Sequence, residues 1–150
     1  MGNNKITPVG MFDILPFDAA IKREIEEKLK ATFTSRGFRE IITPTLEFYD
    51  VFSASQLPQE SMYNLFDPQG RILSLKPDVT APLLRVCSTK LDPKQMPYRI
   101  WYSQQVFRRN KALNARRDET TQCGVEIVGA KGIRADAEAI VTAIKAFLAL

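Results

Sequence analysis

The chain has 150 residues, about the length of one domain, with 45% hydrophobic and 25% charged residues. These values are typical of a globular chain that buries a core, and they exclude a disordered polypeptide. The net charge of +4 permits phosphate-bearing partners without requiring them. We expect a single domain over residues 1–150. Because the last helix reaches Leu150 without a capping residue, we also expect this domain to be the N-terminal part of a longer chain.

The sequence contains no histidine and two cysteines, Cys87 and Cys123, which do not form a C-x-x-C pair. These features exclude a zinc finger and any histidine-dependent catalysis or metal site within the chain, so we expect no metal and no cofactor. Apolar neighbours indicate that both thiols are buried and reduced, as is usual in the cytoplasm. No apolar run approaches the ~20 residues that cross a bilayer. We therefore expect a cytoplasmic protein with no membrane partner.

Residues 18–36 are predicted to form an amphipathic helix, with Asp18 as its N-cap and Gly37 as its stop. The apolar residues of this segment recur every four positions, at Ile21, Ile25, Leu29 and Phe33. Such a stripe indicates a core or subunit-interface face.

A short strand is predicted at residues 41–42, ended by Pro44, and a β-hairpin over residues 61–78. The sequence Asp67-Pro68-Gln69-Gly70 has the residues that a type I turn favours at its first, second and fourth positions. On the return strand, apolar residues alternate with polar ones in the order Leu73, Ser74, Leu75, Lys76.

The second half of the chain predicts a helix, two strands and a last helix. Residues 78–91 form the first helix, with Pro82 in its first turn and Asp78 or Thr80 as its cap. Residues 98–109 and 119–129 form strands on either side of a loop, and residues 134–150 form the last helix. Short turns between strands favour antiparallel pairing, so we expect an α+β fold with an antiparallel sheet flanked by helices.

The loop between these two strands is rich in positive charge. Its basic residues are Arg108, Arg109, Lys111, Arg116 and Arg117. Guanidinium groups fork onto phosphate oxygens, so the loop is a candidate phosphate clamp. The alternative interpretation is a solvated hairpin tip, kept soluble by its charge. A general nucleic-acid-binding protein is a further one, and it predicts binding that weakens steeply with salt.

Polar residues near strand ends suggest a second candidate site. Gln122 and Glu126 lie four positions apart, so they share one face of their strand, while Asp78 and Thr80 follow another strand. If the two strands are close, their side chains would suit a ligand with an ammonium group and ring N–H donors. The alternatives are that Asp78 only caps a helix and that Glu126 only pairs with a neighbouring base.

Several segments in collinear order carry a family resemblance. They are MFDILP, GFREIITPTLE, SMYNLFDPQGRILSLKPDVTA, and VFRR followed by QCGVEIVG. Together they resemble the catalytic core of the class II histidyl-tRNA synthetases, over essentially the whole chain. The resemblance implies a class II core truncated before the third motif. The resemblance also implies that Pro44 closes the first signature motif, which the family uses for dimerisation. Phe107 and Arg108 would begin the second signature motif, a strand-loop-strand that surrounds ATP.

The resemblance implies a histidine-binding site. Asp78 would receive the α-amino group of histidine, and Arg108 would meet its carboxylate. The remaining pocket residues implied by the resemblance are Thr80, Gln122 and Glu126.

The loop that binds the nucleotide in the synthetases differs here. Asn110 stands where a glutamate accepts a hydrogen bond from the adenine amino group, and Asp118 stands where the family has a basic residue. Ala112 and Ala115 stand where the family has a proline and a glycine, and Arg116 lies in the same loop. The resemblance therefore implies a degenerate nucleotide loop.

A retained pocket beside a degenerate loop, together with the wording LKPDVTAPLLR, is similar to the branch of the family that forms the regulatory subunit of ATP phosphoribosyltransferase. This similarity implies no catalytic residue, a separate catalytic subunit as partner, and histidine as effector in the first step of histidine biosynthesis. It also implies a homodimer or hetero-oligomer that binds no tRNA. The alternative is a histidyl-tRNA synthetase fragment that catalyses ATP-dependent histidine activation and tRNA charging.

Overall fold

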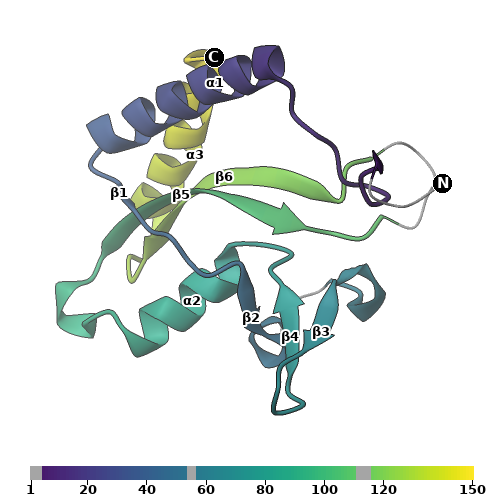
Figure 1. Ribbon diagram of the computed structural model, residues 1–150. Coiled ribbons are helices and arrows are strands. Elements are labelled where there is room, and N and C mark those ends of the chain that lie inside the picture. The colour runs from purple at the N-terminus through teal and green to yellow at the C-terminus, as the bar shows by residue number, and fades with distance from the viewer. Residues whose placement is uncertain (1–4, 54–56, 111–115) are drawn as a thin grey trace. The chain divides into compact units, whose positions relative to one another are not determined.

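The computed structural model describes residues 5–53, 57–110 and 116–150. Its helices and strands give an α+β fold and follow in the order α1 (Pro16–Ser35), β1 (Arg39–Glu40), β2 (Leu46–Phe48), β3 (Asn64–Phe66), β4 (Ile72–Leu75), α2 (Thr80–Thr89), β5 (Tyr98–Phe107), β6 (Glu119–Val128) and α3 (Ile133–Leu148) (Figure 1). Short 3₁₀ turns occur at Tyr49–Phe52, Gln59–Ser61 and Pro93–Gln95. Over the described ranges, no helix has the length and apolarity needed to cross a membrane.

The chain divides into two compact units. Unit 1 consists of Met1–Ile14, Thr43–Arg85 and Gln104–Gln122. Unit 2 consists of Leu15–Ile42, Val86–Ser103 and Cys123–Leu150. Helix α2 and strands β5 and β6 therefore contribute residues to both units.

Helix α1 begins at Pro16, which suits the first helical position because its missing N–H would have no partner there. The N-cap is Leu15, which makes no side-chain cap, so the prediction of Asp18 as N-cap was wrong. Asp18 lies in the first turn, where its negative charge interacts favourably with the positive end of the helix dipole. The predicted stop is confirmed, since Gly37 has a φ of 80°.

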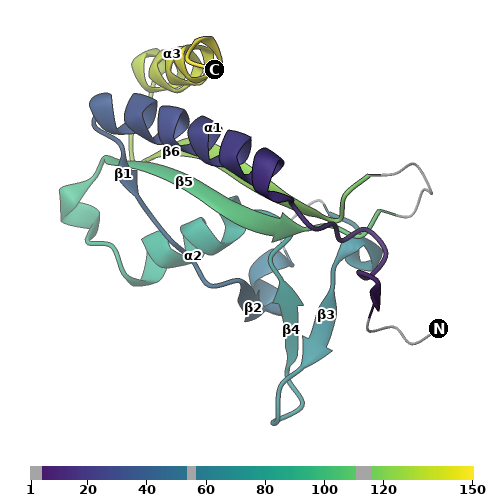
Figure 2. The same ribbon diagram turned by 45° about the horizontal axis from the view of Figure 1, so that its top comes forward.

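The core of unit 2 forms where α1 and α3 pack on the sheet. Its buried residues are Phe33, Phe38, Trp101 and Ala146, with Leu29, Cys123, Val125 and Ile127 packed against them. The rings of Phe33 and Trp101 lie 6.0 Å apart, centroid to centroid. Figure 2 shows α1 and α3 beside each other on one side of β5 and β6. The outer part of the predicted α1 stripe, Ile21 and Ile25, stays exposed.

The sheet of unit 2 has the strand order β1-β5-β6. β1 pairs with β5 in parallel, with Arg39 opposite Ile100 and Glu40 opposite Trp101. The expectation of a wholly antiparallel sheet was therefore wrong at this pair. A long connection separates β1 from β5, and such a crossover is what a parallel pair requires. β1 also lies just before the predicted residues 41–42, although the Ile41 N–H still bonds to the Trp101 carbonyl at 3.0 Å.

Helix α3 packs through small residues. Thr142 and Ala146 are its buried positions, and the Thr142 hydroxyl accepts a hydrogen bond from Arg36 Nε at 2.8 Å. The large apolar residues at helical spacing are instead exposed, at Ile140, Ile144, Phe147 and Leu148. Small side chains at the contact let two helices approach closely.

The sheet of unit 1 is antiparallel, with the strand order β2-β4-β3. The predicted turn between β3 and β4 is confirmed, because the Gly70 N–H bonds to the Asp67 carbonyl at 2.9 Å. The Asp67 side chain also accepts from the N–H groups of Gln69 and Arg71. In and just after β4, the polar residues face the interior instead of the apolar ones. Ser74 and Lys76 are buried, while Leu73 and Leu75 are only half-buried.

Candidate functional site

The candidate site is built around Asp78, in the segment between β4 and α2 of unit 1. Asp78 is half-buried between the buried residues Pro77 and Val79. Its Oδ1 atom accepts a hydrogen bond from the Ala81 N–H at 2.9 Å. Asp78 is therefore the cap of α2, as one of the sequence interpretations predicted, and this bond fixes the orientation of its carboxylate.

Two other predicted site residues hold this segment from either side. Arg108, which follows β5, donates from Nε to the Pro77 carbonyl at 2.7 Å. Gln122, in β6, accepts from the Val79 N–H through Oε1 at 3.1 Å. The structure thus brings Asp78, Arg108 and Gln122 together on one short stretch of backbone.

Each of these three side chains also has polar atoms without a hydrogen-bond partner within residues 5–53, 57–110 and 116–150. They are Oδ2 of Asp78, the two Nη groups of Arg108 and Nε2 of Gln122. A carboxylate attracts an ammonium group, and a guanidinium group binds a carboxylate through paired N–H donors. This arrangement of charges suits a small zwitterion such as an amino acid.

The other two predicted pocket residues are placed differently. Thr80 is the first residue of α2 in unit 1 and is half-buried. Glu126 lies on β6 in unit 2, so the structure does not test its predicted place beside the other four. Burial raises the pKa of the Cys87 thiol, and the charge of Glu126 raises it further.

A buried lysine, Lys76, lies next to the candidate site in the chain. The sequence did not indicate that this residue would be buried. Lys76 is 2% exposed, and its ammonium donates to the Thr43 carbonyl at 3.1 Å and to the Gln104 side chain. Its own carbonyl accepts from the Phe107 N–H at 3.0 Å, next to Arg108. Burial lowers the pKa of Lys76, and the charge of Glu47 acts in the opposite direction. A lysine alternating with leucines is typical of a solvent-facing position, so the sequence carried no signal for this role.

The base of the predicted nucleotide loop is closed by hydrogen bonds. The Asp118 carboxylate accepts from the Asn110 N–H at 3.0 Å, from Asn110 Nδ2 at 3.1 Å and from the Tyr63 hydroxyl. Arg116 is exposed, and the guanidinium of Arg117 lies 5.5 Å from the centre of the Phe12 ring. Lys111, Ala112 and Ala115 lie outside the described residues.

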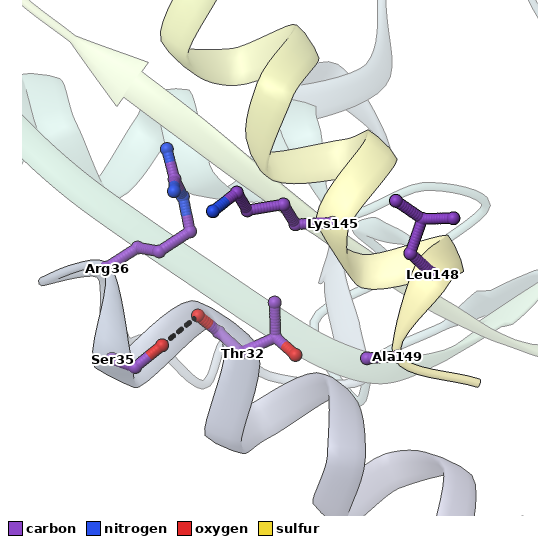
Figure 3. Close-up of a pocket in the computed structure, with 6 residues that line it drawn as sticks. All are labelled: Thr32, Ser35, Arg36, Lys145, Leu148 and Ala149. Atoms are coloured by element: carbon purple, nitrogen blue, oxygen red, sulfur yellow. Dashed lines mark hydrogen bonds between the residues drawn. The ribbon is translucent and has the colours of Figure 1, made fainter.

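A pocket of about 440 Å³ lies in unit 2, between the last turns of α1 and α3 (Figure 3). It is lined by Thr32, Ser35, Arg36, Lys145, Leu148 and Ala149. None of the predicted site residues lines it. Among the described residues, no group of three or more acidic, cysteine or histidine side chains is arranged to bind a metal.

An Arg at a strand end and an Asp at a helix start thus meet on one backbone segment, within the α+β fold of a class II synthetase-like core. A model of the histidyl-tRNA synthetase family matches residues 10–150. The chain therefore belongs to the histidyl-tRNA synthetase family.

Individual relatives refine this placement. The chain is 50% identical to a protein of Clostridium botulinum named ATP phosphoribosyltransferase regulatory subunit, over all of this chain and 36% of that protein. It is 45% identical to a protein of the same name from Acetivibrio thermocellus, over 93% of this chain and 34% of that protein. The chain thus spans about a third of the length of these relatives.

Solved structures agree with the family. A Bacillus halodurans structure described as an ATP phosphoribosyltransferase regulatory subunit/histidyl-tRNA synthetase matches with a TM-score of 0.90 and 33% identity, over 99% of this chain and 39% of that one. The apo histidyl-tRNA synthetase of S. aureus matches with a TM-score of 0.78 and 28% identity, over 95% of this chain and 34% of that one.

Proposed function

We propose that the chain is the N-terminal part of a regulatory subunit of ATP phosphoribosyltransferase, as a single class II core domain. In this role the subunit catalyses nothing itself, activates a separate catalytic subunit and senses histidine in the first step of histidine biosynthesis. We place this work in the cytoplasm, in a homodimer or a hetero-oligomer, without tRNA or a cofactor.

The observation that carries the proposal is the contrast between two neighbouring parts of unit 1. Asp78 and Arg108 present the two charges that an amino acid needs, beside the Gln122 amide, on a segment held by three hydrogen bonds. At the loop base, by contrast, Asn110 bonds to Asp118, where the synthetases of the family are expected to read adenine with a glutamate. The names of the relatives support the same interpretation.

The proposal assigns a role to each pocket residue. Asp78 binds the α-ammonium group of histidine through the carboxylate oxygen that does not cap α2. Arg108 binds the histidine carboxylate through its Nη groups. Thr80, Gln122 and Glu126 line the rest of the pocket.

The test uses the full-length protein and a short-form catalytic subunit. We expect the full-length protein to stimulate the formation of phosphoribosyl-ATP, and histidine to suppress that stimulated rate. Asp78→Asn keeps an oxygen that can cap α2 but loses the charge, so it should weaken the histidine response by about 10- to 100-fold, the usual loss for a charge-assisted hydrogen bond. Asp50→Asn, at an exposed acid of the same unit, is the matched control. Absence of any stimulation would overturn the proposal.

The family model and the exposed arginines of the loop favour a second candidate, a histidyl-tRNA synthetase fragment. Arg109, Arg116 and Arg117 could meet phosphates of ATP or tRNA. Histidine-dependent exchange of pyrophosphate into ATP separates the two candidates. We expect no exchange from the full-length protein, and a clear signal would favour the synthetase.

A further inference from the structure

Asp118 is a buried carboxylate in a segment otherwise dominated by exposed arginines. It is 6% exposed. Its carboxylate accepts hydrogen bonds from the Tyr63 hydroxyl and from both the backbone and side-chain nitrogens of Asn110. A buried carboxylate is tolerated when it accepts several hydrogen bonds, and the contacts of Asp118 satisfy this condition.

The same residue ties three separate segments of unit 1 together. The Asp118 N–H donates to the Gly10 carbonyl at 2.8 Å, which attaches the N-terminal segment. The contact is tight, since a Cβ added at Gly10 would lie 2.5 Å from Asp118 Cγ. Tyr63 attaches the segment before β3 through its hydroxyl. The Asp118 carbonyl accepts from the Arg108 N–H at 2.7 Å, which joins the start and end of the loop.

Asn110 reinforces this closure from the other end of the loop. Its Nδ2 group donates to the Arg117 carbonyl at 3.0 Å and to the Arg108 carbonyl at 3.3 Å, in addition to Asp118. Two of the positions at which the loop differs from the synthetases, Asn110 and Asp118, thus bond to each other. Their joint effect is to fix the backbone of Arg108, whose side chain reaches the Pro77 carbonyl beside Asp78.

We infer that Asp118, with Asn110 and Tyr63, positions Arg108 for the carboxylate of the amino-acid ligand, an inference that rests on the proposed function. Loop residues that would read a nucleotide in a synthetase here act as a brace for the amino-acid site. Asp118 is a positioning residue, because it acts on the ligand only through Arg108.

The test measures histidine binding to the full-length protein by calorimetry. Asp118→Asn keeps the size of the side chain but removes its charge, and we expect the Kd for histidine to rise about tenfold, as for the loss of one charge-assisted hydrogen bond. Tyr63→Phe removes only the hydroxyl donor and leaves the carboxylate, so we expect a smaller rise. Asp50→Asn, an exposed acid of unit 1, should leave the Kd unchanged.

A spectroscopic readout distinguishes this role from a general effect on folding. Burial and the hydrogen bond to Asp118 raise the pKa of Tyr63 to about 12. Alkaline titration of tyrosinate absorbance should show a late-ionising phenol that disappears in Tyr63→Phe and ionises earlier in Asp118→Asn. If Asp118→Asn moves this ionisation but leaves the histidine Kd unchanged, the positioning role is overturned while the proposed function stands. If the unaltered protein binds no histidine, the proposed function fails and this inference fails with it.

Discussion

The ammonium group of Lys76 is buried in unit 1 and bonds to oxygen atoms of Thr43 and Gln104. Taking a charged group out of water costs free energy, and the hydrogen bonds from Lys76 offset part of that cost. Lys76 directly precedes Pro77, whose carbonyl receives Arg108. The lysine therefore anchors the end of β4 from which Asp78 is presented.

We predict that Lys76→Met lowers the free energy of unfolding by about 1–3 kcal/mol at neutral pH, because the buried Thr43 carbonyl loses its charged donor. Burial lowers the pKa of Lys76, so the unfolded chain binds more protons than the folded chain at pH values just below 10.5. The free energy of unfolding of the unaltered protein should therefore increase as the pH approaches 10.5, because Lys76 loses its proton more readily in the folded chain. The methionine variant should lack this increase.

Urea unfolding at neutral pH and at about pH 10 measures both effects. The difference in stability between the two proteins should be larger at the higher pH. Lys30→Met, at an exposed lysine of α1, is the control and should change little at either pH. A difference that narrows with rising pH would contradict the prediction.

At the scale of elements, a side-chain hydrogen bond within unit 2 joins the C-terminal end of α1 to the middle of α3. Thr142 is fully buried, and its hydroxyl donates to the Glu138 carbonyl at 2.7 Å while it accepts from Arg36 Nε at 2.8 Å. Arg36 is the C-cap residue of α1, so this bond fixes the last turn of α1 against α3.

We predict that Thr142→Val, which keeps the shape of the side chain, costs about 1–3 kcal/mol because Arg36 loses a buried acceptor. The urea midpoint of the full-length protein is the measurement. Thr34→Val, at an exposed threonine of α1, provides the matched change without the bond. Equal midpoints for the two variants would mean that the bond contributes nothing.

The turn between β3 and β4 depends on a glycine. Gly70 has a φ of 77°, and a Cβ added there would meet no described atom within 4 Å. The cost of Gly70→Ala is therefore conformational, about 1 kcal/mol. Gly70→Asn should cost less, because asparagine enters the left-handed region more readily than alanine. The Tm from thermal unfolding should be highest for the unaltered protein, lower for Gly70→Asn and lowest for Gly70→Ala. An alanine variant as stable as the unaltered protein would contradict this argument.

Local patterns in the sequence were sufficient for the elements whose signals are local. The spacing of apolar residues predicted α1, and turn residues predicted the hairpin at Asp67–Gly70. β1 was displaced and its direction missed, because its partner β5 lies far along the chain. The buried face of β4 was likewise not predictable, since the acceptors that satisfy Lys76 come from Thr43 and Gln104.

At the scale of the whole molecule, the sequence pointed to residues that lie close together, while their role in binding a ligand stays a prediction. The family resemblance pointed to Asp78, Arg108 and Gln122, and the structure brings these together. It did not point to the residues that support them, Tyr63 and Gly10, because their contacts with Asp118 join segments that are distant in sequence.

The division into two units leads to a last prediction. Asp78, Thr80, Arg108 and Gln122 all lie in unit 1, so a ligand bound there stabilises that unit against local opening. With histidine at about 100 times its Kd, amide exchange through such openings should slow by up to about 100-fold. We expect this protection at residues 76–82 of the full-length protein, and much less in α1 and α3. Hydrogen exchange read by mass spectrometry locates it, and Asp78→Asn should remove it. Protection confined to α1 and α3 would mean that histidine binds elsewhere, since an opening that excludes the ligand is the only one that binding can suppress.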